Sequence, residues 1–319
     1  MAQKKIIAVI RATGAQGGGL VQAILNDKSG EFVARAITRN VNSDKAKALK
    51  AAGVDVVAAD LDDVNSLTAA FKGAYGAFCV TNFWEHFSAE KEIAQVKNMA
   101  TAAKAANVKH VIWSTLEDTR NLVPLSDNRM PTLHEKYKVP HFDGKGESNH
   151  FFTDLGVPTT FLNTSFYWEN FIYFGMGPVR GQDGVLGITF PMGSKPLPGI
   201  GAEDIGKSAY GIFKRGSEFI GKTVGIMGQA LTGAQMAEAM SKALGQPVRY
   251  NDVPADVFRS FGFPGADDLG NMFQYKRDFN EQFVGGRSLA LTRTLNPEVK
   301  TFDAWLAEYG RMIPVPEMA

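Results

Sequence analysis

Residues 6–19 of the chain, IIAVIRATGAQGGG, decide its fold. The first five of these residues are all apolar and predict a short, fully buried strand. The next nine, RATGAQGGG, predict a tight turn, and a helix is predicted to open at Leu20. A buried strand, a glycine turn and a helix near the N-terminus are typical of the phosphate-binding start of a dinucleotide fold.

The glycines of this turn have a chemical purpose. Gly14 and Gly17 stand at the second and third positions of the pattern G-x-x-G-x-x-G. A pyrophosphate must approach the backbone N–H groups at the start of the helix, and residues without a Cβ permit that approach. A packed strand-to-helix turn without a ligand is the alternative, but the strand–turn–helix context favours a nucleotide.

The first position of the pattern holds Arg11 instead of glycine. If the backbone needs a positive φ there, we expect the arginine to strain and displace the turn. If φ is negative, the side chain leaves the crevice or lies along it as a second cation near a 2′-phosphate. Arg11 also keeps open a third reading of the chain, a scaffold that has lost its cofactor.

Composition excludes several classes of protein. The 319 residues hold 34 Lys and Arg against 33 Asp and Glu, so the formal net charge is +1 and direct nucleic-acid binding is not expected. No apolar stretch reaches the roughly 18 residues that span a bilayer, so no membrane segment is expected. The N-terminus lacks the apolar core of a signal peptide. A cytoplasmic protein is therefore expected.

Metal chemistry is not expected either. The single cysteine, Cys79, lies in an apolar run and is interpreted as a buried hydrophobe. One cysteine excludes an internal disulfide, and no His, Cys and Asp residues have the spacing of metal ligands.

Strand and helix patterns alternate along the first half of the chain at intervals of about 20–30 residues. Strands are predicted at residues 32–38, 54–59, 76–80, 108–113 and 159–163, and helices at residues 43–52, after 60–63, and at 90–106. This alternation predicts an α/β fold with a doubly wound parallel sheet of the Rossmann type.

The regularity ends after residue 163. A hairpin is predicted at residues 185–198, one more strand at 223–227, and helices at 202–214, 232–244, 253–261 and 266–279. We predict a Rossmann domain over residues 1–165, with a further strand and helix from about residues 200–228. Residues 166–199 and 229–319 are expected to form a smaller, interleaved α+β C-terminal lobe.

Ligands of such sheets gather beyond the C-terminal ends of the strands. The residues expected around that crevice are the Gly14 turn, Arg39, Asp60, Thr81, Asn82, Ser114 and Asn163, with Leu61 placed to touch an adenine face. An acidic residue after the second strand would bind the ribose 2′-OH of NAD, whereas Arg39 would pair with a 2′-phosphate. A solvated charge is the alternative for Arg39, and NADP(H) is predicted in preference to NAD(H).

Five motifs carry a resemblance to a known family. They are A-T-G-x-Q-G at residues 12–17, T-R-N at 38–40, T-N-F-W-E at 81–85, H-F-D-G-K-G-E at 141–147 and G-F-P-G-A-D-D-L at 262–269. By these motifs the chain resembles the NmrA-like family of atypical short-chain dehydrogenase/reductases over nearly its whole length, and its NADPH-sensor branch in particular. The resemblance implies a Rossmann domain with a small C-terminal lobe, and cofactor contacts from Ala12, Thr13, Gly14, Gln16 and Gly17.

The resemblance also suggests catalytic residues. Active short-chain dehydrogenases use a Tyr-x-x-x-Lys pair, in which tyrosine donates a proton and lysine holds the nicotinamide ribose, with a serine upstream. The aligned residues here are His141 and Lys145, with Ser114 upstream, so the lysine is retained and the tyrosine is not. His141 is either a general acid or a residue that packs at a helix start. Lys145 is predicted to bind the ribose, with a solvated lysine as the alternative. Tyr137 is near in sequence but does not have the i, i+4 spacing from Lys145 that the motif requires.

Two functions follow from these residues. An apolar substrate pocket beside the nicotinamide is predicted, with burial in the core as the alternative, from Phe83, Trp84, Phe166, Tyr167, Trp168 and Phe171. The missing tyrosine favours an NADPH-binding redox sensor that reports the NADPH/NADP ratio to a regulatory protein partner, and this is the function predicted first. The aromatic pocket favours an NADPH-dependent reductase of an apolar carbonyl, quinone or dye-like small molecule. A homodimer is left open.

Overall fold

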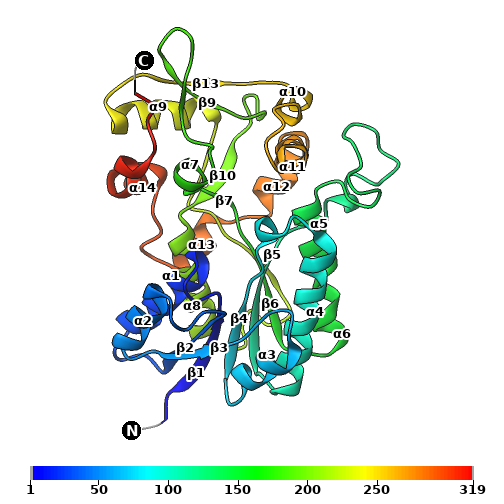
Figure 1. The fold of residues 1–319 in the computed structure, drawn as a ribbon, viewed down its shortest axis with the longest axis vertical. Coiled ribbons are helices and arrows are strands. Elements are labelled where there is room, and N and C mark those ends of the chain that lie inside the picture. Colours follow the sequence, from blue (N-terminus) through cyan, green and yellow to red (C-terminus); the bar gives the residue numbers. More distant parts are fainter. Residues whose placement is uncertain (1–2, 318–319) are drawn as a thin grey trace.

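The computed structural model describes residues 3–317, and its largest sheet has seven parallel strands (Figure 1). Their order is β11-β6-β5-β4-β1-β2-β3. The strands are β1 (Lys5–Ile10), β2 (Phe32–Thr38), β3 (Asp55–Ala58), β4 (Gly76–Cys79), β5 (His110–Thr115), β6 (Thr159–Asn163) and β11 (Thr223–Gly225). The strand order reverses at β1, which confirms the predicted doubly wound α/β sheet.

Helices cover both faces of this sheet. They are α1 (Ala15–Asn26), α2 (Asp44–Ala51), α3 (Val64–Phe71), α4 (Ala89–Ala105), α5 (Pro140–Glu147), α6 (Asn149–Asp154) and α8 (Ala202–Lys214). Helix α1 packs on α8 on one face, and α4 packs on α3, α5 and α6 on the other (Figure 1). Both faces of the strands are therefore buried, which explains their continuous apolar runs.

Helix α1 begins at Ala15, five residues before the predicted start at Leu20. The glycines of the turn are therefore partly helical, and close packing requires them. A Cβ on Gly17 would lie 2.5 Å from the carbonyl oxygen of Arg11, and a Cβ on Gly19 would lie 2.4 Å from that of Glu203 in α8. Glycine disfavours a helix, but here its absent side chain lets α1 approach β1 and α8.

The rest of the chain forms two three-stranded sheets and a set of short helices. The sheets have the orders β12-β10-β7 and β13-β9-β8. Their strands are β7 (Phe166–Tyr167), β8 (Val179–Arg180), β9 (Leu186–Thr189), β10 (Leu197–Ile200), β12 (Gln229–Leu231) and β13 (Val248–Asn251). The helices are α7 (Asn170–Tyr173), α9 (Gly233–Leu244), α10 (Ala255–Arg259), α11 (Ala266–Asp278), α12 (Asn280–Gly285), α13 (Leu289–Leu295) and α14 (Phe302–Tyr309). The described part of the chain also contains three short 3₁₀ helices: η1 (Phe83–Glu85), η2 (Thr119–Asn121) and η3 (Gly310–Met312).

The hairpin predicted at residues 185–198 is wrong. Strand β9 pairs with β8 and β13, whereas β10 pairs with β7 and β12, so the two strands belong to different sheets. Pro191 and Pro196 flank the connection and lack the N–H groups that a hairpin ladder would need beside its turn. The chain therefore leaves one small sheet and enters the other.

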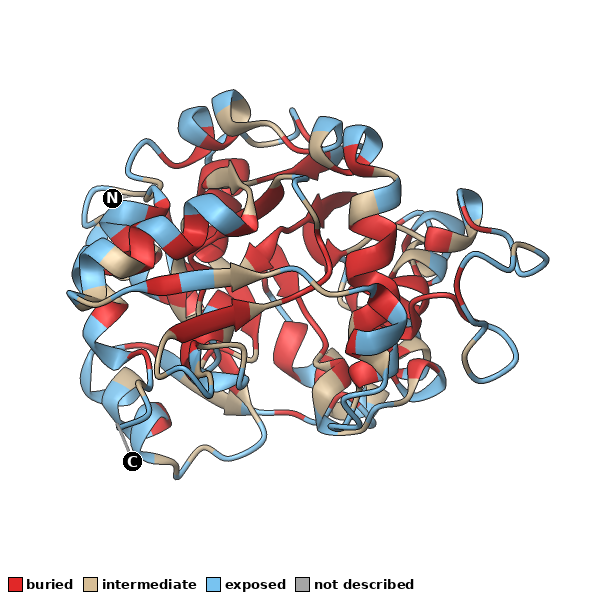
Figure 2. Ribbon diagram, turned by 90° about the horizontal axis from the view of Figure 1, so that it is seen from above, coloured by how far each residue is buried: buried red, intermediate tan, exposed pale blue. Residues whose placement is uncertain are grey.

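Two large hydrophobic clusters form the core. One surrounds the seven-stranded sheet and includes Val9, Phe78 and Trp113; the other contains Trp168, Phe273 and Trp305. Figure 2 shows the central strands buried and the exposed residues on the outer helices and loops. Cys79 is buried in the first cluster, where burial raises the pKa of its thiol, as expected for a packed hydrophobe. Within residues 3–317, no helix combines the length and the apolar character needed to cross a membrane.

Candidate functional site

Two cavities meet at the turn between β1 and α1. The first encloses about 350 Å³ and is lined by Ile10, Arg11, Thr13, Gly14, Ile37, Thr38, Arg39, Ala59, Asp60, Leu61, Asp62, Glu85, His86, Lys91 and Gln95. The second encloses about 520 Å³, and its wall includes Arg11, Gly14, Gln16, Gly17, Thr81, Asn82, Phe83, Trp84, Ser114, His141, Lys145, Phe166 and Tyr167. Arg11 and Gly14 line both cavities, so a ligand longer than either cavity can pass from one to the other across this turn.

The turn itself combines a strained residue with an uncapped helix. Arg11 has a φ of +54°, in the left-handed region, and its carbonyl accepts a hydrogen bond from the Gly14 N–H at 2.8 Å. Gly14 is the N-cap of α1 and supplies no side-chain cap. Within residues 3–317, no side chain caps the N–H groups of the first turn of α1, which lies beside both cavities, and this arrangement suits an anion.

The side chain of Arg11 lies along the crevice, although its φ is positive. Its guanidinium donates to Oε1 of Glu85, and Nη2 of the exposed Arg39 lies 3.2 Å from the same oxygen. The hydrogen bond from Arg11 has the largest effect on Glu85. Together with the charges of Arg11 and Arg39, it holds the pKa of the Glu85 carboxyl below its usual range. One carboxylate therefore contacts both arginines in the first cavity, where a phosphate was predicted to bind.

Lys145 lies on the wall of the second cavity but is not a free surface lysine. Its Nζ donates to Oε1 of Glu92 at 2.8 Å and to Oγ1 of Thr81 at 2.5 Å, and Glu92 is fully buried. A lysine ammonium has three N–H donors, so one remains beyond these two bonds. Oε2 of Glu92 is buried without a hydrogen-bond partner among the described residues. Glu92 was not predicted as a site residue, because it lies inside the pattern of a long helix.

Ser114 and Gln16 form a separate polar chain. The Ser114 hydroxyl donates to Oε1 of Gln16 at 2.8 Å, and the Gln16 amide donates to the hydroxyl of Tyr167. Burial raises the pKa of Tyr167 to about 12. Ser114 thus points toward the start of α1, and its hydroxyl bonds to Gln16 instead of His141 or Lys145.

His141 is paired with an acid from a distant helix. Its backbone N–H donates to Oδ2 of Asp268 at 3.1 Å, and its Nδ1 lies 2.5 Å from Oδ1 of the same carboxylate. Both side chains are almost completely buried, and the ring of Trp84 lies 4.9 Å from that of His141. Asp268 was missed as a site residue, although it lies within the G-F-P-G-A-D-D-L motif and in the first turn of α11.

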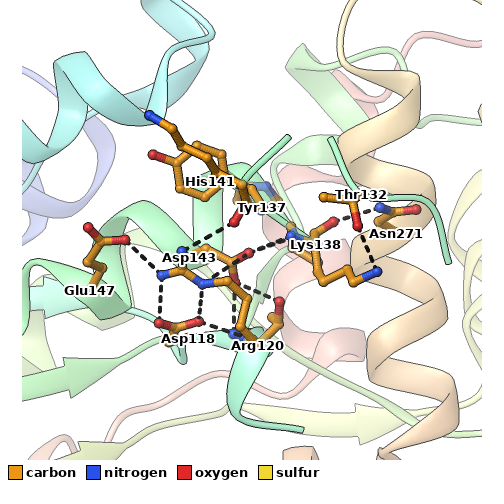
Figure 3. Close-up of polar contacts among 12 residues, drawn as sticks. Asp118, Arg120, Thr132, Tyr137, Lys138, His141, Asp143, Glu147 and Asn271 are labelled. Atoms are coloured by element: carbon orange, nitrogen blue, oxygen red, sulfur yellow. Dashed lines mark hydrogen bonds and ion pairs between the residues drawn. The ribbon is translucent and has the colours of Figure 1, made fainter. Parts of the chain in front are cut away.

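A network of buried polar groups holds the start of α5, and with it His141 (Figure 3). Oδ2 of Asp143 accepts hydrogen bonds from the backbone N–H groups of Lys138 and Val139, and its Oδ1 accepts from that of Thr119. Tyr137 points away toward Glu90, to which its hydroxyl donates at 3.2 Å, and burial raises its pKa to about 12. Tyr137 does not line either cavity.

Other predicted residues lie outside both cavities. Ala12 and Asn163 are buried at the ends of β1 and β6, where Thr164 and Ser165 line the second cavity in place of Asn163.

Trp168 packs on Phe302 and Trp305 instead of lining a pocket. Phe171 also packs on Phe302. These two aromatics belong to the core, which corrects that part of the predicted pocket; their large rings fill space beneath α14.

Comparisons with known proteins agree with the fold of the chain. The model of the NmrA-like family matches residues 3–306. The NmrA-like family domain-containing oxidoreductase FrzB of a Cladobotryum species is 29% identical over 304 residues, which cover 89% of this chain and 86% of that protein. The negative transcriptional regulator NmrA has been solved with NAD and with NADP; these structures are 26% identical, cover 96% of this chain and 95% of that chain, and give TM-scores of 0.78 and 0.77.

The same fold occurs in an enzyme with lower identity. The Citrobacter triphenylmethane reductase complexed with NADP(H) is 20% identical, covers 95% of this chain and 98% of that chain, and has a TM-score of 0.73. The likeness to this reductase is one of fold alone.

Proposed function

This chain belongs to the NmrA-like family, and from that premise we propose that it is an NADP(H)-dependent oxidoreductase that reduces an apolar small molecule. The observation that carries the proposal is that His141, paired with Asp268, lies on the wall of an apolar cavity that begins at the glycine turn. The cavity joins the place for a dinucleotide to a group that can exchange a proton.

The residues present fit a dinucleotide. The uncapped start of α1 at Gly14 lies between the two cavities, and we assign the pyrophosphate to its N–H groups. Arg39 and Arg11 would hold a 2′-phosphate, Asp60 and Leu61 would contact the adenosine, and Lys145 would use its remaining N–H toward the nicotinamide ribose. The bound NADPH supplies a hydride. We propose NADP(H) in preference to NAD(H) because two arginines, Arg11 and Arg39, line the first cavity near the predicted ribose position.

The proton chemistry is assigned to His141. The carboxylate of Asp268 lies at Nδ1 and fixes the orientation of the ring, which leaves Nε2 as the atom that exchanges a proton with a substrate. The rings of Phe83, Trp84 and Phe142 pack around the imidazole, so that little of His141 is exposed. His141 would thereby replace the tyrosine that this chain lacks.

A second candidate function, a redox sensor, is supported by a different observation. Glu85 contacts both arginines of the first cavity, and its neighbour Trp84 packs on His141 in the second. A 2′-phosphate that takes the arginines from Glu85 would shift this segment and change the surface around it. The 26% identity to the regulator NmrA over 96% of the chain also supports this reading.

One titration separates the two functions. NADPH is added to the protein and its binding is followed by fluorescence; quinones, aldehydes and neutral aromatic ketones are then added while the absorbance at about 340 nm, which hydride transfer abolishes, is recorded. Consumption of NADPH that His141→Gln removes supports the reductase. Binding without consumption by any acceptor supports the sensor and overturns the reductase.

A further inference from the structure

Lys276 lies deep on the wall of the second cavity, among aromatic rings. It is 3% exposed and comes from the last turn of α11. Its Nζ lies between 5.1 and 5.9 Å from the ring centroids of Phe142, Phe166, Phe273 and Phe283. The one hydrogen bond of Nζ among the described residues goes to Sδ of Met272, at 3.3 Å, and thioether sulfur is a weak acceptor.

The other basic side chains that line this cavity each have a carboxylate. Arg11 is paired with Glu85, Lys145 with Glu92, and His141 with Asp268. Within residues 3–317, Lys276 forms no salt bridge. A buried ammonium without a counter-charge is destabilised unless a partner is supplied. The chain therefore leaves one cation of this cavity for a group that it does not itself provide.

We propose that Lys276 is the anchor for an anionic group on the substrate, so that the substrate class is an apolar molecule bearing a carboxylate, sulfonate or phenolate oxygen. The inference rests on the proposed function only in taking the second cavity as the substrate site. The rings of Phe142, Phe166 and Phe283 and the side chain of Met272 line the cavity and would contact the apolar body next to the anion. The ammonium would donate a charge-assisted hydrogen bond to the anionic oxygen.

The position of Lys276 relative to Asp268 gives the anchor a direction. Asp268, Met272 and Lys276 are spaced by four residues and so lie along one face of α11. Eight residues of helix separate the Cα atoms of Asp268 and Lys276 by about 12 Å along the axis. The side chain of Lys276 reaches back toward Met272. The ring of Phe142 lies 4.8 Å from that of His141 and 5.4 Å from Nζ of Lys276, so the imidazole and the ammonium are at most about 10 Å apart. A substrate that contacts both groups therefore carries its anionic group within about that distance of the reacting atom.

The environment of Lys276 also makes this anchor sensitive to pH. Burial, and then the nearby positive charge of Arg287, lower the pKa of Lys276 to about 7, against the opposing effect of Glu117. Arg287 is itself held by Glu117, with Nη1 at 2.6 Å from Oε1. An anionic ligand binds the protonated amine, so its affinity is greatest below about pH 7 and falls as the pH rises above that value. A cationic dye is disfavoured in the same pH range.

The test compares two fluorescent probes that differ in one charged group. 1-Anilinonaphthalene-8-sulfonate carries a sulfonate, and N-phenyl-1-naphthylamine is the same ring system without it. The ratio of their dissociation constants is measured on the full-length protein at pH 6.0 and 8.5, without any turnover. For the unmodified protein we expect the sulfonate to bind about ten- to a hundredfold more tightly at pH 6.0, and its advantage to shrink at pH 8.5.

Two variants assign this advantage to one residue. Lys276→Met should bring the ratio to near unity at both pH values and should fold, because methionine fills similar space without a buried charge. Lys276→Arg should keep the sulfonate preference at pH 8.5, because a guanidinium stays protonated. Lys242→Met, at an exposed site on α9, should change neither constant.

An unmodified protein with no preference for the sulfonate, or a preference that survives in Lys276→Met, overturns the anchor. The separate NADPH titration keeps the two proposals distinguishable. If the probe preference depends on Lys276 while NADPH does not bind, the anchor stands and the proposed function fails.

Discussion

Nδ1 of His141 lies 2.5 Å from Oδ1 of Asp268, a residue 127 positions away in the sequence. The same carboxylate accepts the backbone N–H of His141, so Asp268 fixes both the start of α5 and the rotation of the imidazole. A carboxylate at one ring nitrogen directs the other toward a reacting partner. This relationship favours the catalytic interpretation of His141 over simple packing at a helix start.

Asp268→Asn tests this orientation. An amide can turn its NH₂ toward Nδ1 and select the wrong tautomer, and it cannot stabilise a charged imidazolium. We expect kcat for NADPH-dependent reduction to fall by about 100-fold or more, with the pH profile of kcat/KM altered and NADPH affinity unchanged. Stopped-flow single-turnover rates and fluorescence titration provide the two measurements.

The exposed neighbour Asp267 gives a matched control. Asp267→Asn should keep kcat within about twofold of the unmodified protein, since surface substitutions of this kind change little. Asp268→Glu should recover part of the lost rate. An Asp268→Asn variant with full kcat would exclude an orienting role for this carboxylate.

Lys145 and Glu92 form a buried ion pair, and this changes what Lys145→Ala would report. The substitution would weaken NADPH binding but also leave the carboxylate of Glu92 buried and uncompensated, at about 3–5 kcal/mol of folding stability. The double variant Lys145→Met with Glu92→Gln removes both charges. We expect it to unfold in urea near the midpoint of the unmodified protein while its NADPH affinity stays low; His141→Ala should leave that affinity nearly intact. Restored NADPH binding in the double variant would contradict a ribose contact by Lys145.

The strands of the large sheet could be predicted because their signal is local. Each is an apolar run followed by a turn, and the structure has β2 and β6 at the residues predicted. The start of α1 could not be predicted because glycine is a poor helix former, and only its contacts with β1 and α8 favour it there. The prediction of a hairpin at residues 185–198 failed for a related reason, because apolar patterning does not determine which of several strands a segment will pair with.

The site shows the same division between local and distant information. The glycine turn and Arg39 could be predicted as site residues because each directly follows a predicted strand in the sequence. Asp268 and Glu92 acquire their partners only when distant helices pack together, and no spacing rule links them to His141 or Lys145. Lys276 stands in the sequence QYKRD, which is typical of a solvated helix end, and the structure instead buries it. Charged residues of this kind are therefore identified only by the fold.

Glu85 contacts both arginines of the first cavity and should compete with a 2′-phosphate for them. In Glu85→Gln this competition is removed, and we expect NADPH to bind about three- to tenfold more tightly while NADH affinity is unchanged. Arg39→Asp should have the opposite effect and reverse the preference for NADPH, because a charge-assisted contact supplies roughly one to two decades of affinity. Calorimetric titration with both cofactors measures these changes. Equal affinities for NADPH and NADH in the unmodified protein would remove the basis of both expectations.

His110 predicts an acid sensitivity that originates in the fold. It is fully buried in β5, its Nε2 lies 2.8 Å from Oγ1 of Thr160, and burial lowers its pKa to about 4. Above about pH 6.5 the residue is neutral in both the folded and unfolded chains and adds no pH dependence. As the pH falls from 6.5 to 4, only the unfolded chain binds the proton. The free energy of unfolding should then fall by about 1.4 kcal/mol per pH unit from this residue, to a total of at most about 3 kcal/mol.

His110→Gln separates this effect from other acid-sensitive groups. Glutamine can keep a bond to Thr160 and does not titrate. Urea unfolding at pH 7.0 and 4.5 should show a smaller loss of stability in the variant than in the unmodified protein. The same loss in both proteins would mean that His110 can be protonated in the folded state at little cost.

Arg11 combines two effects that one substitution can separate. Its φ of +54° strains a residue with a Cβ by roughly 1 kcal/mol, while its guanidinium contacts Glu85 in the cavity that also holds Arg39. Arg11→Gly should relieve the strain and raise Tm by about 2 °C. It should also remove a cation from the predicted phosphate site, so that NADPH binds more weakly and NADH does not. Arg11→Lys keeps both the charge and the strain and should change neither Tm nor selectivity greatly. If Arg11→Gly tightens both cofactors equally, the arginine only distorts the turn and is not a phosphate ligand.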